Sequence, residues 1–282
     1  MFTLICENSR GQQINLTNCH DYNVTSVEGL TPPTASINTT KVALGDGAIY
    51  NSSVVNERNV VITLYIVGDI ERNRQRLYSI FKVKQLCTVR YKNQYRDVYV
   101  EGYVESFEAT IFSKTQKVQI SILCPSAYLT NSNQKEYTFS WTTDGFQFPF
   151  SINESGTEFG TVENISTINV YNGGDIDTGI TIEMRANGAV LNPTLLNTQT
   201  GEKMAINYSL STGDVVRITT YRGHKRIFLT HNGTTTNIIN RLSNDSSWFT
   251  ILVGDNLFAY QASSGGSNLD VKFILSELYE GV

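Results

Sequence analysis

Residues 56–81 read NERNVVITLYIVGDIERNRQRLYSIF, and this stretch decides much of what can be predicted about the fold. Residues 59–67 are apolar at almost every position, which predicts a strand that is central in a sheet or covered on both faces. Gly68 and Asp69 then interrupt the strand, and Asp69 is a residue type that favours the N-cap of a helix. The stretch therefore predicts a buried strand followed directly by a helix.

The predicted helix covers about residues 70–83. Glu71 lies in its first turn, and Lys82 and Lys84 lie near its end, where the helix dipole favours these charges. Apolar residues recur at helical spacing and predict one buried face, formed by Ile70, Leu77, Ile80 and Phe81.

Three predicted strands follow the helix, at residues 87–91, 97–112 and 116–123. The third shows strict alternation, which is typical of a half-buried strand, and Cys124 and Pro125 end it. Residues 129–135 are polar and lack periodicity, so we expect a domain boundary there. The first domain, residues 1–130, is predicted to be α+β with one helix.

Beyond the boundary, Gly and Asn turn signals recur about every ten residues, and Asn187-Gly188 and Asn232-Gly233 are strong hairpin turns. No convincing helical periodicity separates them. Residues 136–282 are therefore predicted to form an all-β sandwich or barrel of jelly-roll type. Its candidate strands are residues 166–171, 179–185, 214–220, 225–230, 249–253, 257–261 and 269–275.

Residues 31–57 contain Pro32-Pro33 and Gly45-Asp46-Gly47 within a polar stretch. The stretch is too polar to supply core and too long for a simple turn. We therefore expect a long loop or arm, and a mobile surface loop is the alternative interpretation.

The composition excludes several classes of protein. Hydrophobic residues make up 40% and charged residues 17% of the 282, which indicates a globular chain with a core. The net charge is −4 and no Lys/Arg cluster is present, so a nucleic-acid binder is not expected. No signal peptide is recognised and no apolar run approaches the roughly 20 residues that span a membrane, so we expect a soluble chain made in the cytoplasm.

The four cysteines lack the close pairing of a metal site, so we expect them to be reduced and mostly buried: Cys6, Cys19, Cys87 and Cys124. Phosphate-binding loops and the nucleophile elbow are also absent. His224 and His231 lack a third ligand, and residues 175–179 resemble a calcium loop only faintly. We predict no catalytic residue, no metal and no cofactor.

Two functional alternatives remain open in the sequence. Trp141 and Trp248, with Phe146 and Phe148, could stack on sugars, although such residues more often pack a core. They would make the second domain a carbohydrate-binding module that contacts the host cell wall. A cell-wall hydrolase would need a carboxylate pair, for which Glu154 and Glu158 are the candidates.

Three features together resemble the distal tail (Dit) protein family of siphophages. They are the strand, Gly-Asp and helix of residues 56–81, the strands that end in CPSAYL at residues 124–129, and a C-terminal series of turns. That series includes NGGD at 172–175, NTQTG at 197–201, LSTGD at 210–214 and VGDN at 253–256.

The resemblance implies a structural protein of the virion tail tip, assembled in the host cytoplasm. Six tail-tube-like first domains would form a ring between the tail tube protein and the tail-tip hub protein. Galectin-like second domains would project outward, where receptor-binding proteins attach. In this interpretation the arm at 31–57 joins neighbouring subunits, with Thr34, Asn38, Lys41, Gly45, Asp46 and Tyr50 as candidate contact residues.

Overall fold

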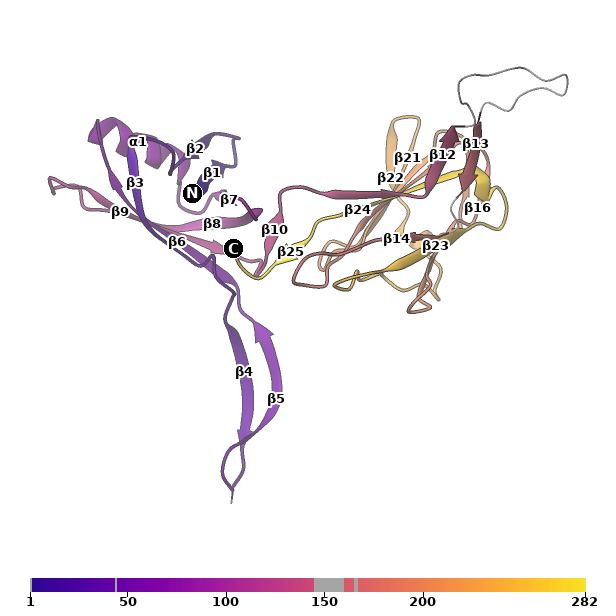
Figure 1. The fold of residues 1–282 in the computed structure, drawn as a ribbon, viewed down its shortest axis with the longest axis horizontal. Helices are drawn as coiled ribbons and strands as arrows, with labels where there is room; N and C mark the ends of the chain where they lie inside the picture. Colours follow the sequence, from indigo (N-terminus) through magenta and orange to yellow (C-terminus); the bar gives the residue numbers. More distant parts are fainter. Residues whose placement is uncertain (1, 44, 145–159, 165–166) are drawn as a thin grey trace. The chain divides into compact units, whose positions relative to one another are not determined.

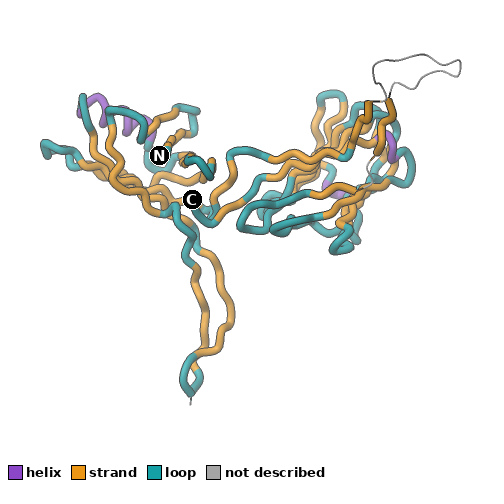
Figure 2. The backbone as a smooth tube through the Cα atoms, viewed as in Figure 1, coloured by secondary structure: helices purple, strands orange, loops and turns teal. Residues whose placement is uncertain are grey.

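The structure is a computed structural model that describes residues 2–43, 45–144, 160–164 and 167–282. The chain forms two compact units (Figure 1). Unit 1 comprises Met1–Asn133 and Leu278–Val282, and unit 2 comprises Gln134–Glu277. Both units are built mainly from strands, with one α-helix in the described residues (Figure 2). No described helix is long and apolar enough to cross a membrane.

Unit 1 is built on a nine-stranded antiparallel sheet. Its main path runs β2 (Gln13–Asn15), β1 (Thr3–Asn8), β7 (Leu86–Lys92), β8 (Asp97–Ala109), β9 (Lys117–Cys124), β6 (Arg58–Ile66) and β3 (Tyr22–Glu28). Two short strands complete it, because β10 (Leu129–Asn131) pairs with both β8 and β25 (Leu278–Tyr279). Since β3 has β6 as its sheet neighbour, it forms one edge of this path.

The predicted strand-and-helix unit is confirmed. The strand β6 lies between β9 and β3, and α1 (Ile70–Ile80) follows it. The Asp69 carboxylate accepts a hydrogen bond from the Arg72 amide at 3.2 Å, as expected of an N-cap. The buried face also includes Asn73, whose side chain donates to the Val67 carbonyl at 2.8 Å.

The predicted helix end was wrong, because the helix stops at Ile80 and leaves Lys82 and Lys84 outside it. Phe81 is buried and caps the helix by donating its amide to the Leu77 carbonyl at 2.8 Å. Lys84 then adopts a left-handed conformation with φ 68°, which ends any helical continuation.

The core of unit 1 contains three buried thiols, Cys6, Cys87 and Cys124, and all four cysteines are free. Gly102 lies opposite Cys87 in the β7–β8 ladder. A Cβ atom at Gly102 would lie 2.6 Å from the Cys124 sulfur and 2.8 Å from the Leu123 carbonyl oxygen. The absence of a side chain at Gly102 therefore makes room for the Cys124 sulfur.

We predict that Gly102→Ala destabilises unit 1 by about 1–3 kcal/mol, because the added methyl overpacks this part of the core. Urea denaturation monitored by far-UV circular dichroism measures the change in the free energy of unfolding. Adding Cys124→Ala should recover part of the loss. Equal stability of Gly102→Ala and the native chain would show that the sheet relaxes around the methyl.

The turn between β7 and β8 is closed by an ion-pair network. Asp97 accepts from the Arg90 Nε at 2.9 Å and lies 3.0 Å from the Lys92 Nζ. Burial acts to raise the pKa of Asp97, but the hydrogen bonds from Arg90 and Lys92 outweigh it and lower the pKa to about 2.

Because the folded-state pKa of Asp97 is depressed, its ionised form stabilises the fold above the unfolded pKa of about 4. That contribution is lost as the pH falls from about 4 through 2. We predict that Asp97→Asn costs about 1 kcal/mol at pH 7 and that the difference from the native chain shrinks below pH 4. Denaturation curves at pH 7, 5 and 3 measure this, and a pH-independent difference would contradict it.

The C-terminal residues lie in a different unit from the one expected. The predicted second domain included all of residues 136–282. Leu278–Val282 return to unit 1, because β25 completes the ladder beside β10. The Val282 amide also donates to the Leu30 carbonyl at 3.1 Å. Backbone pairing with unit 1 therefore fixes the C-terminal segment.

Unit 2 contains a six-stranded sheet and a four-stranded sheet. The first runs β11 (Lys135–Thr138), β24 (Leu269–Leu275), β15 (Thr181–Ala186), β20 (Val215–Thr219), β21 (Arg226–His231) and β22 (Thr234–Asn237). The second runs β14 (Thr167–Asn169), β23 (Leu257–Gln261), β17 (Thr194–Asn197) and β18 (Lys203–Ala205).

Short elements complete unit 2. Two strand pairs are β12 (Ser140–Asp144) with β13 (Gly160–Asn164), and β16 (Val190–Leu191) with β19 (Ser209–Leu210). Two 3₁₀ turns are η1 (Ile239–Arg241) and η2 (Gly266–Asn268). The turn at Asn232 and Gly233 has positive φ at both residues, 47° and 79°, and joins β21 to β22 as a hairpin.

The two sheets of unit 2 share one core. Phe258 on β23 and Phe273 on β24 are both buried, with ring centroids 4.9 Å apart. Side chains from both sheets belong to the same hydrophobic cluster, so unit 2 is a β-sandwich. The candidate strand at residues 249–253 was wrong, since only an isolated bridge between Ile251 and Thr178 forms there.

Candidate functional site

The stretch expected to be a loop or arm contains a two-stranded hairpin, β4 (Ala35–Lys41) and β5 (Ala48–Val55). Among the described strands, β4 and β5 pair only with each other, and Figure 1 shows the hairpin extending away from the rest of unit 1. Every residue of both strands is exposed. An isolated two-stranded hairpin is only marginally stable in water, so we expect a partner surface to stabilise this one.

The hairpin carries large apolar side chains on both faces. Ile37 is 66% exposed and Val54 is 68% exposed. Ile37 lies opposite Ser53, whose hydroxyl is 2.8 Å from that of Tyr50, so Ile37 and Tyr50 share one face. Val54 lies opposite Ser36, one residue along, and so occupies the other face.

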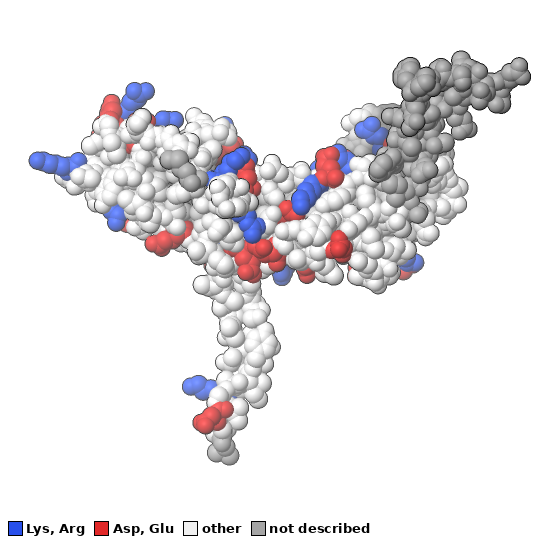
Figure 3. All heavy atoms as spheres, viewed as in Figure 1, with Lys and Arg blue, Asp and Glu red and all other residues white. Residues whose placement is uncertain are grey.

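The hairpin is also nearly free of charge. Lys41 is the only charged residue in its two strands, and Asp46 lies in the connection between them. Figure 3 shows the hairpin as a largely uncharged surface with one basic and one acidic side chain toward its tip. Exposed apolar and aromatic side chains without charge are typical of the centre of a protein–protein interface.

All six arm residues named from the sequence are exposed and belong to this hairpin or its base. Thr34 closes the base, where its carbonyl accepts from the Asn56 amide at 3.0 Å. Asn38, Lys41 and Tyr50 lie on the strands, and Gly45 and Asp46 lie between them. The predicted arm residues do not include Ile37, Ile49 and Val54, although β-branched residues are a recognisable strand signal.

Arg58 fixes the base of the hairpin. It is the first residue of β6 and is only 3% exposed. Its guanidinium donates hydrogen bonds to the carbonyls of Gly29, of Thr31 at 2.8 Å, of Ala127 at 2.9 Å and of Glu280 at 2.6 Å. One side chain therefore holds the segment that enters the hairpin, the segment after β9 and the C-terminal segment.

Burial lowers the pKa of Arg58 from its usual value. The guanidinium nevertheless stays protonated, since arginine does not lose its proton in proteins. Four backbone carbonyls compensate the cost of placing this charge inside unit 1.

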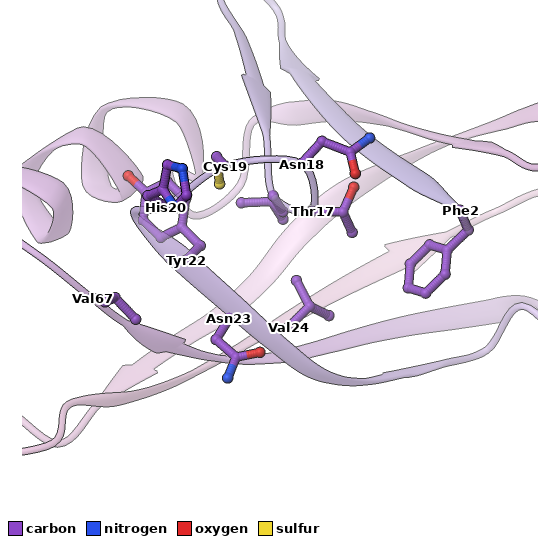
Figure 4. Close-up of a pocket in the computed structure, with 10 residues that line it drawn as sticks. Phe2, Thr17, Asn18, Cys19, His20, Tyr22, Asn23, Val24 and Val67 are labelled. Atoms are coloured by element: carbon purple, nitrogen blue, oxygen red, sulfur yellow. The ribbon is translucent and has the colours of Figure 1, made fainter.

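A groove of about 530 Å³ lies beside the first half of the edge strand β3. Figure 4 shows side chains from the N-terminal segment, the segment before β3, and β3 itself around it. Phe2 and Val67 are partly exposed, at 37% and 45%. The lining residues are Phe2, Leu16, Thr17, Asn18, Cys19, His20, Tyr22, Asn23, Val24 and Val67.

Among the sugar-stacking candidates, only the Trp248 side chain lies in the described part of the chain. Trp248 is half-buried and packs against the core of unit 2, with the Lys225 Nζ 5.5 Å from its ring centroid. Trp141 lies on β12, but its side chain is outside the described part, as are Phe146 and Phe148. Carbohydrate binding therefore stays a prediction.

The described residues hold no group of three or more His, Cys, Asp or Glu side chains placed to bind a metal. The His231 Nδ1 lies 2.5 Å from the Asp214 carboxylate. Within the faint calcium-like stretch, Asp177 accepts from the Val253 amide at 2.8 Å. Glu154 and Glu158 lie outside the described residues.

Two family models match the chain. Residues 9–124 match the phage tail protein RIFT-related domain, and residues 173–274 match the siphovirus-type tail component, C-terminal domain. The chain belongs to the siphophage distal tail protein family. The resemblance inferred from the sequence is thus confirmed. By the descriptions of both matching models, the chain is a structural component of a phage tail.

Solved structures share its fold over nearly the whole length. The Dit protein (gp 19.1) of phage SPP1, described as a paradigm of the hub adsorption apparatus in phages that infect Gram-positive hosts, aligns with a TM-score of 0.69 at 15% identity. The alignment covers 98% of this chain and 99% of that one. A chain of the phage P2 baseplate in its activated conformation with Ca aligns with a TM-score of 0.58 at 10% identity, covering 100% of both.

A second P2 baseplate structure, with Sr, aligns with a TM-score of 0.53 at 9% identity over 98% of both chains. No curated protein sequence matches the chain. At these identities the structures establish the fold, which is mainly β with one helix and two β-sheet domains.

Proposed function

We propose that six copies of this chain form a ring that connects the tail tube to the tail-tip hub. The observation that carries the proposal is the β4–β5 hairpin, whose strands consist of exposed residues, carry one charge and present large apolar side chains on both faces. A surface of this kind stabilises a molecule when a partner covers it. Head-to-tail contacts between identical subunits close into a ring when the rotation between neighbours allows it.

In this proposal unit 1 is the ring-forming domain. The hairpin acts as the intersubunit arm, with Thr34, Asn38, Lys41, Gly45, Asp46 and Tyr50 as contact candidates. Arg58 supports that role, because its buried guanidinium joins the segment that enters the hairpin to two other segments of unit 1. A fixed base reduces the entropy that is lost when the arm binds its neighbour.

Unit 2 is proposed to be the peripheral, galectin-like domain to which receptor-binding proteins attach. The proposed axial partners of the ring are the tail tube protein and the hub protein. The sandwich of unit 2 has its own core, which supports an independent role for this domain.

Light scattering of the purified chain across a concentration series tests the ring. We expect a species near six times the chain mass of 31.5 kDa, with open rings in negative stain. A chain that stays monomeric at every concentration, alone and with the tail tube protein added, would contradict the proposal.

A further inference from the structure

We infer that the groove beside β3 receives the β4–β5 hairpin of a second copy of this chain by strand addition. The inference rests on the proposed ring and goes further by naming the receiving surface. Among the described strands, β3 has one edge without a strand partner, and the hairpin strands β4 and β5 pair only with each other.

The edge of β3 is open to a further strand. Tyr22–Glu28 pairs with β6 on one side, and the strand contains neither lysine nor proline, which commonly protect edges. A bulge between Val24 and Ser26 divides the edge, and the groove lies beside the first half, at Tyr22, Asn23 and Val24. Backbone groups and an adjacent pocket are therefore available together, as strand addition requires.

The hairpin matches this edge in length and chemistry. Both β3 and β4 have seven residues, and the outer edges of the hairpin are unpaired among the described strands. Successive side chains of each hairpin strand point to opposite faces, so an apolar one can enter the groove while the backbone pairs. Ile37 and Val54 are the most exposed aliphatic side chains of the hairpin, one on each face.

Charge also favours this pairing. His20 is the only titratable side chain in the groove besides Cys19 and Tyr22, and none of the lining residues is a carboxylate or a lysine. The hairpin strands carry only Lys41, near the tip. Strand addition here would bury no unpaired charge, which is the main cost of such an interface.

Cys19 lines the groove and makes the inference testable. It is the one cysteine that is not fully buried. Burial raises the pKa of the Cys124 thiol to about 12, and a hydrogen bond with Cys87 together with burial raises the pKa of Cys6 well above its usual value. Cys19 is therefore the native thiol that a cross-linker should reach.

The experiment places one new cysteine on the hairpin of the full chain, as Ile37→Cys or Val54→Cys, and treats the oligomer with a short bismaleimide. Matched controls carry the same change together with Cys19→Ser. We expect at least one hairpin variant to give about tenfold more chain-to-chain linkage than its control, because the ring holds the two thiols at high effective concentration. Mass spectrometry should identify the linked peptides of residue 19 and the hairpin.

Phe112→Cys tests a rival occupant, since Phe112 is a fully exposed apolar side chain at the β8–β9 turn. Rings that form without hairpin-to-Cys19 linkage, or that link Cys19 to residue 112, would overturn the inference and leave the proposed ring intact. A chain that remains monomeric at every concentration would overturn both.

Discussion

Replacing Arg58 with alanine is expected to lower the free energy of unfolding of unit 1 by about 3 kcal/mol or more. The change removes four charge-assisted hydrogen bonds and leaves the carbonyls of Gly29, Thr31, Ala127 and Glu280 without this donor. For a domain of this size the midpoint of thermal unfolding should fall by about 10 °C. Differential scanning calorimetry of the full chain measures both quantities.

Arg58→Lys is the matched control, because it keeps the charge but cannot form the same fork of hydrogen bonds. We expect its loss to lie between those of the native chain and Arg58→Ala. If lysine restored full stability, charge alone would account for the role of Arg58. An unchanged midpoint for alanine would show that the four carbonyls find other donors.

The second large effect is expected from charges on the hairpin. Ile37→Asp together with Val54→Asp should weaken self-association by at least about 100-fold, because each face of the hairpin would bring an unpaired carboxylate into the interface. The fold should change in stability by less than about 0.5 kcal/mol, since both side chains are exposed in the single chain. Sedimentation velocity measures the association, and urea denaturation measures the stability.

Ile239→Asp serves as the control for added charge. Ile239 is also an exposed apolar residue, at 41%, and lies in unit 2. We expect this variant to assemble as the native chain does. Assembly that survives the double hairpin change would exclude the hairpin as the intersubunit arm.

The elements that could be predicted are those determined by residues close together in the sequence. The apolar run of β6, the Gly68-Asp69 break and the N-cap at Asp69 lie within a few residues of each other, so the strand and the helix could be predicted. The end of the helix could not, because it depends on burial of Phe81 against the unit 1 core. Lys82 and Lys84 are suitable residues for a last helical turn, but tertiary packing overrides that preference.

The site depends on contacts that are distant in sequence. Arg58 reaches Gly29 and Glu280, which lie 29 and 222 positions away. Its sequence context, an arginine at the start of an apolar strand, does not reveal these partners. The return of β25 to unit 1 is hidden for the same reason, since two residues are too few to show a periodic pattern.

The hairpin was predicted as an arm, but its strands were not. Polar Thr, Asn and Ser residues dominate β4, and they weaken the apolar alternation that indicates a strand. The turn signal at Gly45-Asp46-Gly47 was correct, because Gly47 adopts φ 91° between the two strands. Apolar residues alternate along a strand when one of its faces is buried. Neither face of this hairpin is buried within its own chain.

Electron cryomicroscopy of intact tail tips would show whether the chain forms a ring and what its hairpins touch. We expect a single ring with six copies of unit 1 between tube and hub, in which each hairpin contacts the neighbouring copy. A tail tip in which this chain forms no closed ring, or in which the hairpins extend into solvent without touching a neighbour, would contradict it.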